Sequence, residues 1–74
     1  LSITGCKRLN NINALISLTT VKEITITDCP AIYDFCIIKN VVQENNSSFY
    51  TTGNGYNPTK YQLLNGQCSD ISKE

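Results

Sequence analysis

The chain has 74 residues, with six basic and six acidic side chains, no histidine and four cysteines. This length allows one domain, which buries only about 60% of the surface that the unfolded chain exposes. The balanced charge argues against a nucleic-acid or anionic-membrane binder, and no apolar run is long enough to predict membrane insertion. There is no signal-peptide pattern and no initiator methionine, so we expect a processed or trimmed piece.

The N-terminal part of the chain contains a repeat. The segment 1–9 returns as the segment 24–32, with apolar residues on apolar residues and Cys6 on Cys29. A period of roughly 20 to 29 residues, with a Cys or Asn closing a short strand, is typical of leucine-rich repeats. The pattern therefore predicts parallel strands that begin at Leu1 and Ile24. We call each strand with its return segment a rung.

The first rung has no predicted neighbour on its N-terminal side. A rung buries its apolar side chains against a neighbouring rung. We therefore expect an open apolar face that a second copy of the chain or a missing N-terminal segment covers. Its members are Leu1, Ile3, Leu9, Ile12, Leu15 and Leu18.

The middle of the chain predicts a helix and then a third strand. Asp34 can cap a helix from Phe35 to about Glu44, with Asn45-Asn46 as its stop. Its buried face would be Phe35, Ile38, Val41 and Val42. After it, Phe49 aligns with Ile24 at a slightly longer spacing than the first period, and Asn54 takes the position of the repeated cysteine.

The last part of the chain predicts a short helix and a tail. Asn57-Pro58 reads as an N-cap followed by a proline at the first helical position, and Gly66 as the left-handed residue after the helix. We divide the chain into a folded part, 1–68, and a flexible tail, 69–74. Tyr33, Tyr56 and Tyr61 lie around these cap segments, where we expect packing rather than a platform that stacks on sugars.

The repeat frame, together with the segments 33–36, 52–59 and 65–69, resembles the C-terminal repeats and cap of secreted or cell-surface bacterial leucine-rich-repeat proteins of internalin-like or receptor-L-domain-like architecture. The resemblance implies an α/β fold, a fragment of a leucine-rich-repeat solenoid. It would have a short parallel sheet of about three strands, turns and helices on the convex side, and a helical C-terminal cap. It also implies an extracellular or cell-surface location and a scaffold for binding. One departure is Thr51, which stands where an aliphatic residue is usual.

The four cysteines divide into two pairs. Cys6 and Cys29 share one position of the repeat, so we expect parallel, buried, reduced thiols, although their distance alone does not exclude a disulfide. Cys36 and Cys68 lie outside the repeat register, and a disulfide between them is expected to close the cap. A metal site is disfavoured, because the chain has no Cys-x-x-Cys pair and no histidine.

A ligand would contact the concave face of the sheet. The outward positions form one column of Ser2, Thr25 and Tyr50 and a second of Thr4, Thr27 and Thr52. Threonine also favours strands for purely structural reasons. Without histidine, paired carboxylates or an activated nucleophile, we expect no enzyme and no cofactor. The sequence thus favours a recognition module for a protein or glycan, and the alternative is a structural segment that ends a solenoid or self-associates.

Overall fold

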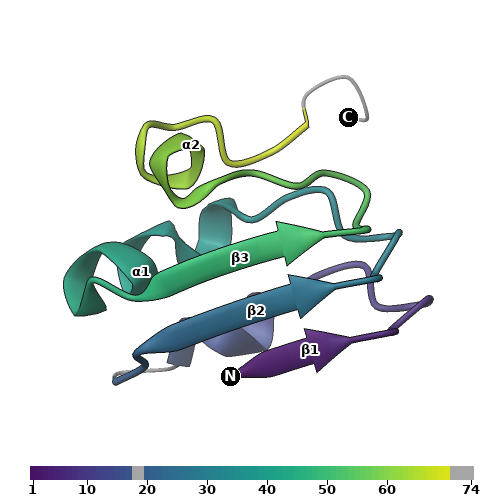
Figure 1. The fold of residues 1–74 in the computed structure, drawn as a ribbon, viewed down its shortest axis with the longest axis horizontal. Helices are drawn as coiled ribbons and strands as arrows, with labels where there is room; N and C mark the ends of the chain where they lie inside the picture. Colours follow the sequence, from purple (N-terminus) through teal and green to yellow (C-terminus); the bar gives the residue numbers. More distant parts are fainter. Residues whose placement is uncertain (18–19, 71–74) are drawn as a thin grey trace.

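The computed structural model describes residues 1–17 and 20–70. It is a small α/β structure with one three-stranded parallel sheet in the order β1-β2-β3 (Figure 1). The strands are β1 (Ser2–Thr4), β2 (Glu23–Thr27) and β3 (Ser48–Thr52). The helical elements are the 3₁₀ helices η1 (Asn13–Ser17) and η2 (Cys36–Ile38) and the α-helices α1 (Lys39–Asn45) and α2 (Lys60–Leu64). Within the described residues, none of these helices has the length and apolar character needed to cross a membrane.

The strands pair in the register that the repeat predicts. Ile3 of β1 lies opposite Ile26 of β2, and Ile24 of β2 lies opposite Phe49 of β3. Both predicted alignments between strands are therefore confirmed. Because side chains alternate between the two faces of a strand, this register places the isoleucines of β1 and β2 and Phe49 of β3 on one side of the sheet.

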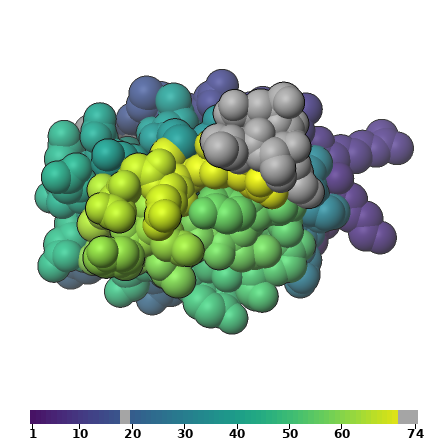
Figure 2. Space-filling view, turned by 90° about the horizontal axis from the view of Figure 1, so that it is seen from above, coloured from purple at the N-terminus to yellow at the C-terminus, as the bar shows by residue number. Residues whose placement is uncertain are grey.

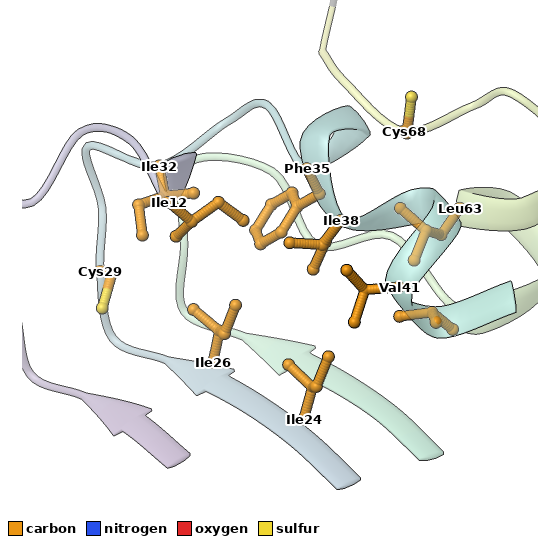
Figure 3. Packing of buried hydrophobic residues seen from close by; sticks show 11 residues of the cluster. Ile12, Ile24, Ile26, Cys29, Ile32, Phe35, Ile38, Val41, Leu63 and Cys68 are labelled. Carbon is orange, nitrogen blue, oxygen red and sulfur yellow. The ribbon is translucent and has the colours of Figure 1, made fainter. Parts of the chain in front are cut away.

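The core lies between that side of the sheet and the helical segments (Figure 3). Ile24 and Ile26 of β2 are fully buried, as are Phe35 and Ile38 from the helical layer. Burying one large aliphatic or aromatic side chain contributes about 1.5 to 3 kcal/mol. The rings of Phe35 and Phe49 meet edge to face, with their centroids 6.0 Å apart. The predicted buried face of the first helix, which also includes Val41 and Val42, is confirmed.

The turn after each strand has the same backbone conformation. Gly5, Asp28 and Gly53 follow β1, β2 and β3 and have φ values of 67°, 56° and 70°. One residue further on, the ladder positions are filled by Cys6, Cys29 and Asn54. The amide of Asn54 joins two rungs, because it accepts a hydrogen bond from the Cys29 N–H at 2.9 Å and donates one to the Ile26 carbonyl at 2.8 Å.

The first predicted helix begins later than expected. Asp34 accepts a hydrogen bond from the Cys36 N–H at 3.0 Å, but the chain then forms η2 before α1 begins at Lys39. Phe35 itself lies outside the helix, with φ −113° and ψ 8°, and its carbonyl accepts the Ile38 N–H at 3.1 Å in a 3₁₀ turn. The stop is as predicted: Asn46 adopts the left-handed conformation directly after α1.

The start of the last helix is a second correction. Asn57 does not cap α2, because its amide is engaged with the backbone of Asn54. Thr59 is the N-cap instead and forms a reciprocal capping box with Gln62. Gly66 has φ 90°, as predicted for the residue that follows the helix. Figure 2 shows α2 and the chain after it lying over the β3 end of the molecule.

The first rung is less open than predicted. Ile12 is only 4% exposed and belongs to the core, and Ile3, Leu9 and Leu15 pack against the core while partly buried. The prediction of an open face is wrong for Ile12, because the return segment after β1 folds back under the sheet. Leu1 remains 44% exposed, and Ile16 of η1 is 61% exposed. Leu18 lies outside the described residues.

The segment at Cys68 and Ser69 is fixed to the segment that follows β2. Cys36 and Cys68 form the expected disulfide, with their Cα atoms 4.9 Å apart. Cys6 and Cys29 are free thiols; Cys29 is buried as expected, but Cys6 is only partly buried. Ser69 forms an antiparallel bridge with Asp34, so the ordered chain continues past the expected boundary at Cys68. The rest of the expected tail, 71–74, lies outside the described residues.

Candidate recognition face

The side of the sheet that faces away from the core is the candidate site, and we call it the outer face. The sheet register places Ser2 opposite Thr25 and Thr25 opposite Tyr50. It likewise places Thr4, Thr27 and Thr52 in one row across the three strands. The structure thus brings all six predicted positions together. Their role in binding remains a prediction.

The two columns differ in how their side chains are used. Thr27 donates a hydrogen bond from its Oγ1 to the Oγ1 of Thr4 at 2.9 Å, which links β2 to β1. Thr25 and Thr27 are partly covered because they lie on the central strand, whereas Ser2, Thr4 and Thr52 are exposed. Tyr50 is 59% exposed and is the only large aromatic side chain among the six. An exposed tyrosine beside hydroxyl groups offers both apolar area and hydrogen bonding to a ligand.

The rim of the outer face carries a charge and a further hydroxyl. Glu23 begins β2 and is exposed, next to the exposed Lys22. Glu23 pairs in register with Ser48, the first residue of β3. The sequence reasoning did not include Ser48, although the alignment of Ile24 with Phe49 already placed it one step before Phe49. The six central positions of the face carry no charge.

The outer face is backed by the buried core. β2, its central strand, has Ile24 and Ile26 fully buried on its other side. Below β3, Thr51 donates a hydrogen bond from its Oγ1 to the Pro58 carbonyl at 3.0 Å. The departure from an aliphatic residue at this position therefore has a structural reason, since the hydroxyl joins β3 to the segment that leads into α2.

The two free thiols offer little nucleophilic chemistry. Desolvation raises the pKa of the Cys6 thiol above its ordinary value, and the neighbouring Cys29 thiol raises it further through charge repulsion and a hydrogen bond. A raised pKa lowers the fraction of reactive thiolate at neutral pH. Cys29 is fully buried, and its thiol lies 3.3 Å from the Thr27 carbonyl, within hydrogen-bonding distance. Both thiols therefore resemble structural cysteines rather than catalytic ones.

Comparison of the chain with known proteins found no relative. No family model, no curated protein and no solved structure matches the chain.

Proposed function

We propose that the chain is a non-enzymatic recognition module of leucine-rich-repeat type, which binds a protein or glycan through the outer face. The observation that carries the proposal is the composition of this face, where six uncharged side chains from three strands form two aligned columns. Such a surface pairs hydroxyl groups with one exposed aromatic anchor, Tyr50. Interface hot spots are enriched in tyrosine.

The repeat pattern supports a solenoid origin for this module. Each rung consists of a strand, a left-handed turn residue and a segment that returns across the core side of the sheet. In solenoid proteins, stacked units of this kind create extended sheets that serve as binding surfaces. The Cys36–Cys68 disulfide supports an extracellular or cell-surface location, because disulfides persist in oxidising compartments.

A selection for ligands tests the proposal. The immobilised chain is screened against a glycan array and a display library of structured peptides, and the binders are titrated against variants. We expect Tyr50→Ala to weaken binding by at least about tenfold, because it removes the aromatic anchor. Thr27→Val removes the central hydroxyl and keeps the strand preference, so it should also weaken binding.

Tyr61→Ala is the matched control for the tyrosine substitution. Tyr61 is 75% exposed and lies on α2, away from the outer face. The control should bind as the original chain does, and all variants should melt at similar temperatures. Binders that are insensitive to both outer-face substitutions would contradict the proposal, as would a selection that returns no binder.

The second candidate function is structural, namely self-association or the ending of a longer solenoid. Two observations favour it: Leu1 and Ile16 are exposed at the β1 end of the molecule, and β1 pairs with one strand only among the described residues. Sedimentation equilibrium distinguishes this candidate from the first. A dimer that dissociates in the Ile16→Lys variant, combined with outer-face variants that lose no binding, would favour the structural role.

A further inference from the structure

A second candidate site lies on the other side of the molecule from the outer face, between the chain segments that return after β1 and β2. It is a cavity of about 520 Å³, which is within the range of small-molecule sites. Six of the side chains that line it are Asn10, Asn11, Asn13, Tyr33, Asp34 and Ile37. None of them belongs to the outer face.

The repeat itself creates this cavity. The register of the first two strands pairs Ser2 with Thr25, and the same offset along the chain relates Asn10 to Tyr33 and Asn11 to Asp34. The two walls are therefore equivalent segments of adjacent rungs. In the first rung the segment carries three asparagines, and in the second it carries a tyrosine and an aspartate.

The wall formed by the second rung is bonded, on the side away from the cavity, to residues 68–70. Phe35 donates its N–H to the Cys68 carbonyl, and the Tyr33 carbonyl accepts the Asp70 N–H at 3.0 Å. The disulfide fixes this contact at Cys36. A wall that is already fixed lowers the ordering cost of binding a ligand.

Some polar groups of the cavity are occupied and others are available. The Asn11 amide is used within its own wall, since it donates to the Asn10 Oδ1 and accepts from the Asn13 N–H, both at 3.2 Å. One carboxylate oxygen of Asp34 accepts the Cys36 N–H. Among the described residues, no hydrogen bond involves the Asn13 side-chain amide, the Tyr33 hydroxyl or the second oxygen of Asp34.

The chemistry of this lining selects the ligand class. None of the described residues that line the cavity is cationic, so an anion would find no charge partner among them. Amides both donate and accept hydrogen bonds, and a carboxylate accepts several. The Tyr33 ring and the partly exposed Ile37 add apolar area. We propose that this cavity binds one pyranose ring of a neutral sugar, with its hydroxyl groups on Asn13 and Asp34 and an apolar ring face on Tyr33.

This proposal revises the expectation that Tyr33 serves only to pack the cap. It does not depend on the proposed function of the outer face, because the two sites share no residue. Failure at one site therefore leaves the other untouched, and substitutions can address them separately.

The test is a titration of the ¹⁵N-labelled full chain followed by NMR. The probes are methyl α-mannopyranoside, methyl β-galactopyranoside and N-acetylglucosamine. We expect at least one of them to produce saturable amide shifts in residues 10–13 and 33–37, with a dissociation constant on the order of 1 mM. If chitobiose binds more tightly than N-acetylglucosamine, the site takes a sugar within a glycan, and equal affinity identifies the single ring as the unit bound.

Substitutions in both walls should weaken the binding. Tyr33→Ala should weaken it by about tenfold through loss of the ring, and Asn13→Ala by about fivefold through loss of one hydrogen bond. Asp34→Asn keeps an oxygen for the Cys36 N–H and removes the carboxylate, so it tests the site even if Tyr33→Ala fails to fold. The matched controls are Tyr61→Ala and Asn40→Ala, on α2 and α1 and outside the cavity.

Three results would overturn the proposal. The first is the absence of saturable shifts with all three sugars. The second is binding that the Asn13 and Asp34 variants leave unchanged. The third is saturation at the same amides by calcium chloride or tetramethylammonium chloride when no sugar binds, which would identify a cation site instead.

Discussion

The residue directly after each strand is where the repeat is most sharply defined. Gly5, Asp28 and Gly53 occupy equivalent turns and all have positive φ values. Glycine adopts this conformation without steric cost, and aspartate tolerates it better than most residues. The sequence alignment already placed these three residues together, but the shared backbone conformation became visible only in the structure.

Substituting the two glycines separates backbone strain from crowding. At Gly5, a methyl group would meet no atom within 4 Å, so Gly5→Ala should cost only the strain of the left-handed backbone, about 1 kcal/mol. At Gly53, the methyl group would overlap the Asp28 carboxylate and lie 3.2 Å from the Asp28 backbone nitrogen. We expect Gly53→Ala to cost about 2 to 4 kcal/mol. Urea unfolding of both variants measures the difference, and equal costs would contradict the described turn.

Asn54 illustrates a side chain that holds two rungs together. Its two hydrogen bonds to the second rung are partly buried. Asn54→Ala would leave the Cys29 N–H and the Ile26 carbonyl without their partner and should cost about 2 to 3 kcal/mol. Asn13→Ala is the control, because Asn13 is exposed and its side chain makes no hydrogen bond among the described residues. If both variants unfold at the same urea concentration, the bridging role is refuted.

At the scale of elements, the sequence located both helices but misplaced where they begin. Phe35 has φ −113° and ψ 8°, outside the helical region, and it pairs with Cys68, far along the chain; a local pattern does not reveal such a pairing. At the last helix, two capping signals compete within a short segment. Asn57 is engaged by the turn at Asn54, and Thr59 becomes the cap. The C-terminal ends of the helices were easier to predict, because asparagine and glycine readily adopt the left-handed conformation, as Asn46 and Gly66 do here.

The capping box of α2 allows a test of whether Thr59, rather than Asn57, is the N-cap. The Thr59 hydroxyl accepts the Gln62 N–H at 3.1 Å, and the Gln62 side chain accepts the Thr59 N–H at 2.9 Å. Thr59→Ala should lower the free energy of unfolding by about 1 kcal/mol. Thr59→Ser keeps the hydroxyl and should be nearly neutral. Thermal unfolding followed by circular dichroism compares them, and a loss of equal size in both variants would show that the cap is not the cause.

At the scale of the whole molecule, the sequence predicted the parallel sheet, its register and the disulfide. The sheet follows from the repeat, and the disulfide from the cysteines outside it. The cavity between the return segments was not predicted, although its asparagines and the repeat equivalents of Asn10 and Asn11, Tyr33 and Asp34, were present in the sequence. A local pattern does not indicate whether two adjacent turns meet or leave a space, since this depends on how both pack against the core.

The disulfide should carry a large share of the stability of so small a core. Cys36 and Cys68 are separated by 32 positions in the sequence, and closing a loop of this size stabilises the folded state by about 3 to 4 kcal/mol in the chain-entropy model. We expect Cys36→Ser combined with Cys68→Ser to lower the free energy of unfolding by that amount in urea. Cys6→Ser, which removes a free thiol, is the control. A double variant as stable as this control would contradict the estimate.

The parallel register is the central claim, because the outer face, the core and the cavity all depend on it. A slip of one residue would move every side chain of a strand to the opposite face. Cross-strand nuclear Overhauser effects measure the register directly. The structure predicts backbone contacts that join Ile3 to Ile26 and Ile26 to Thr51 in the parallel pattern. Contacts in the antiparallel pattern, or a pairing of Thr27 with Ile3, would contradict it.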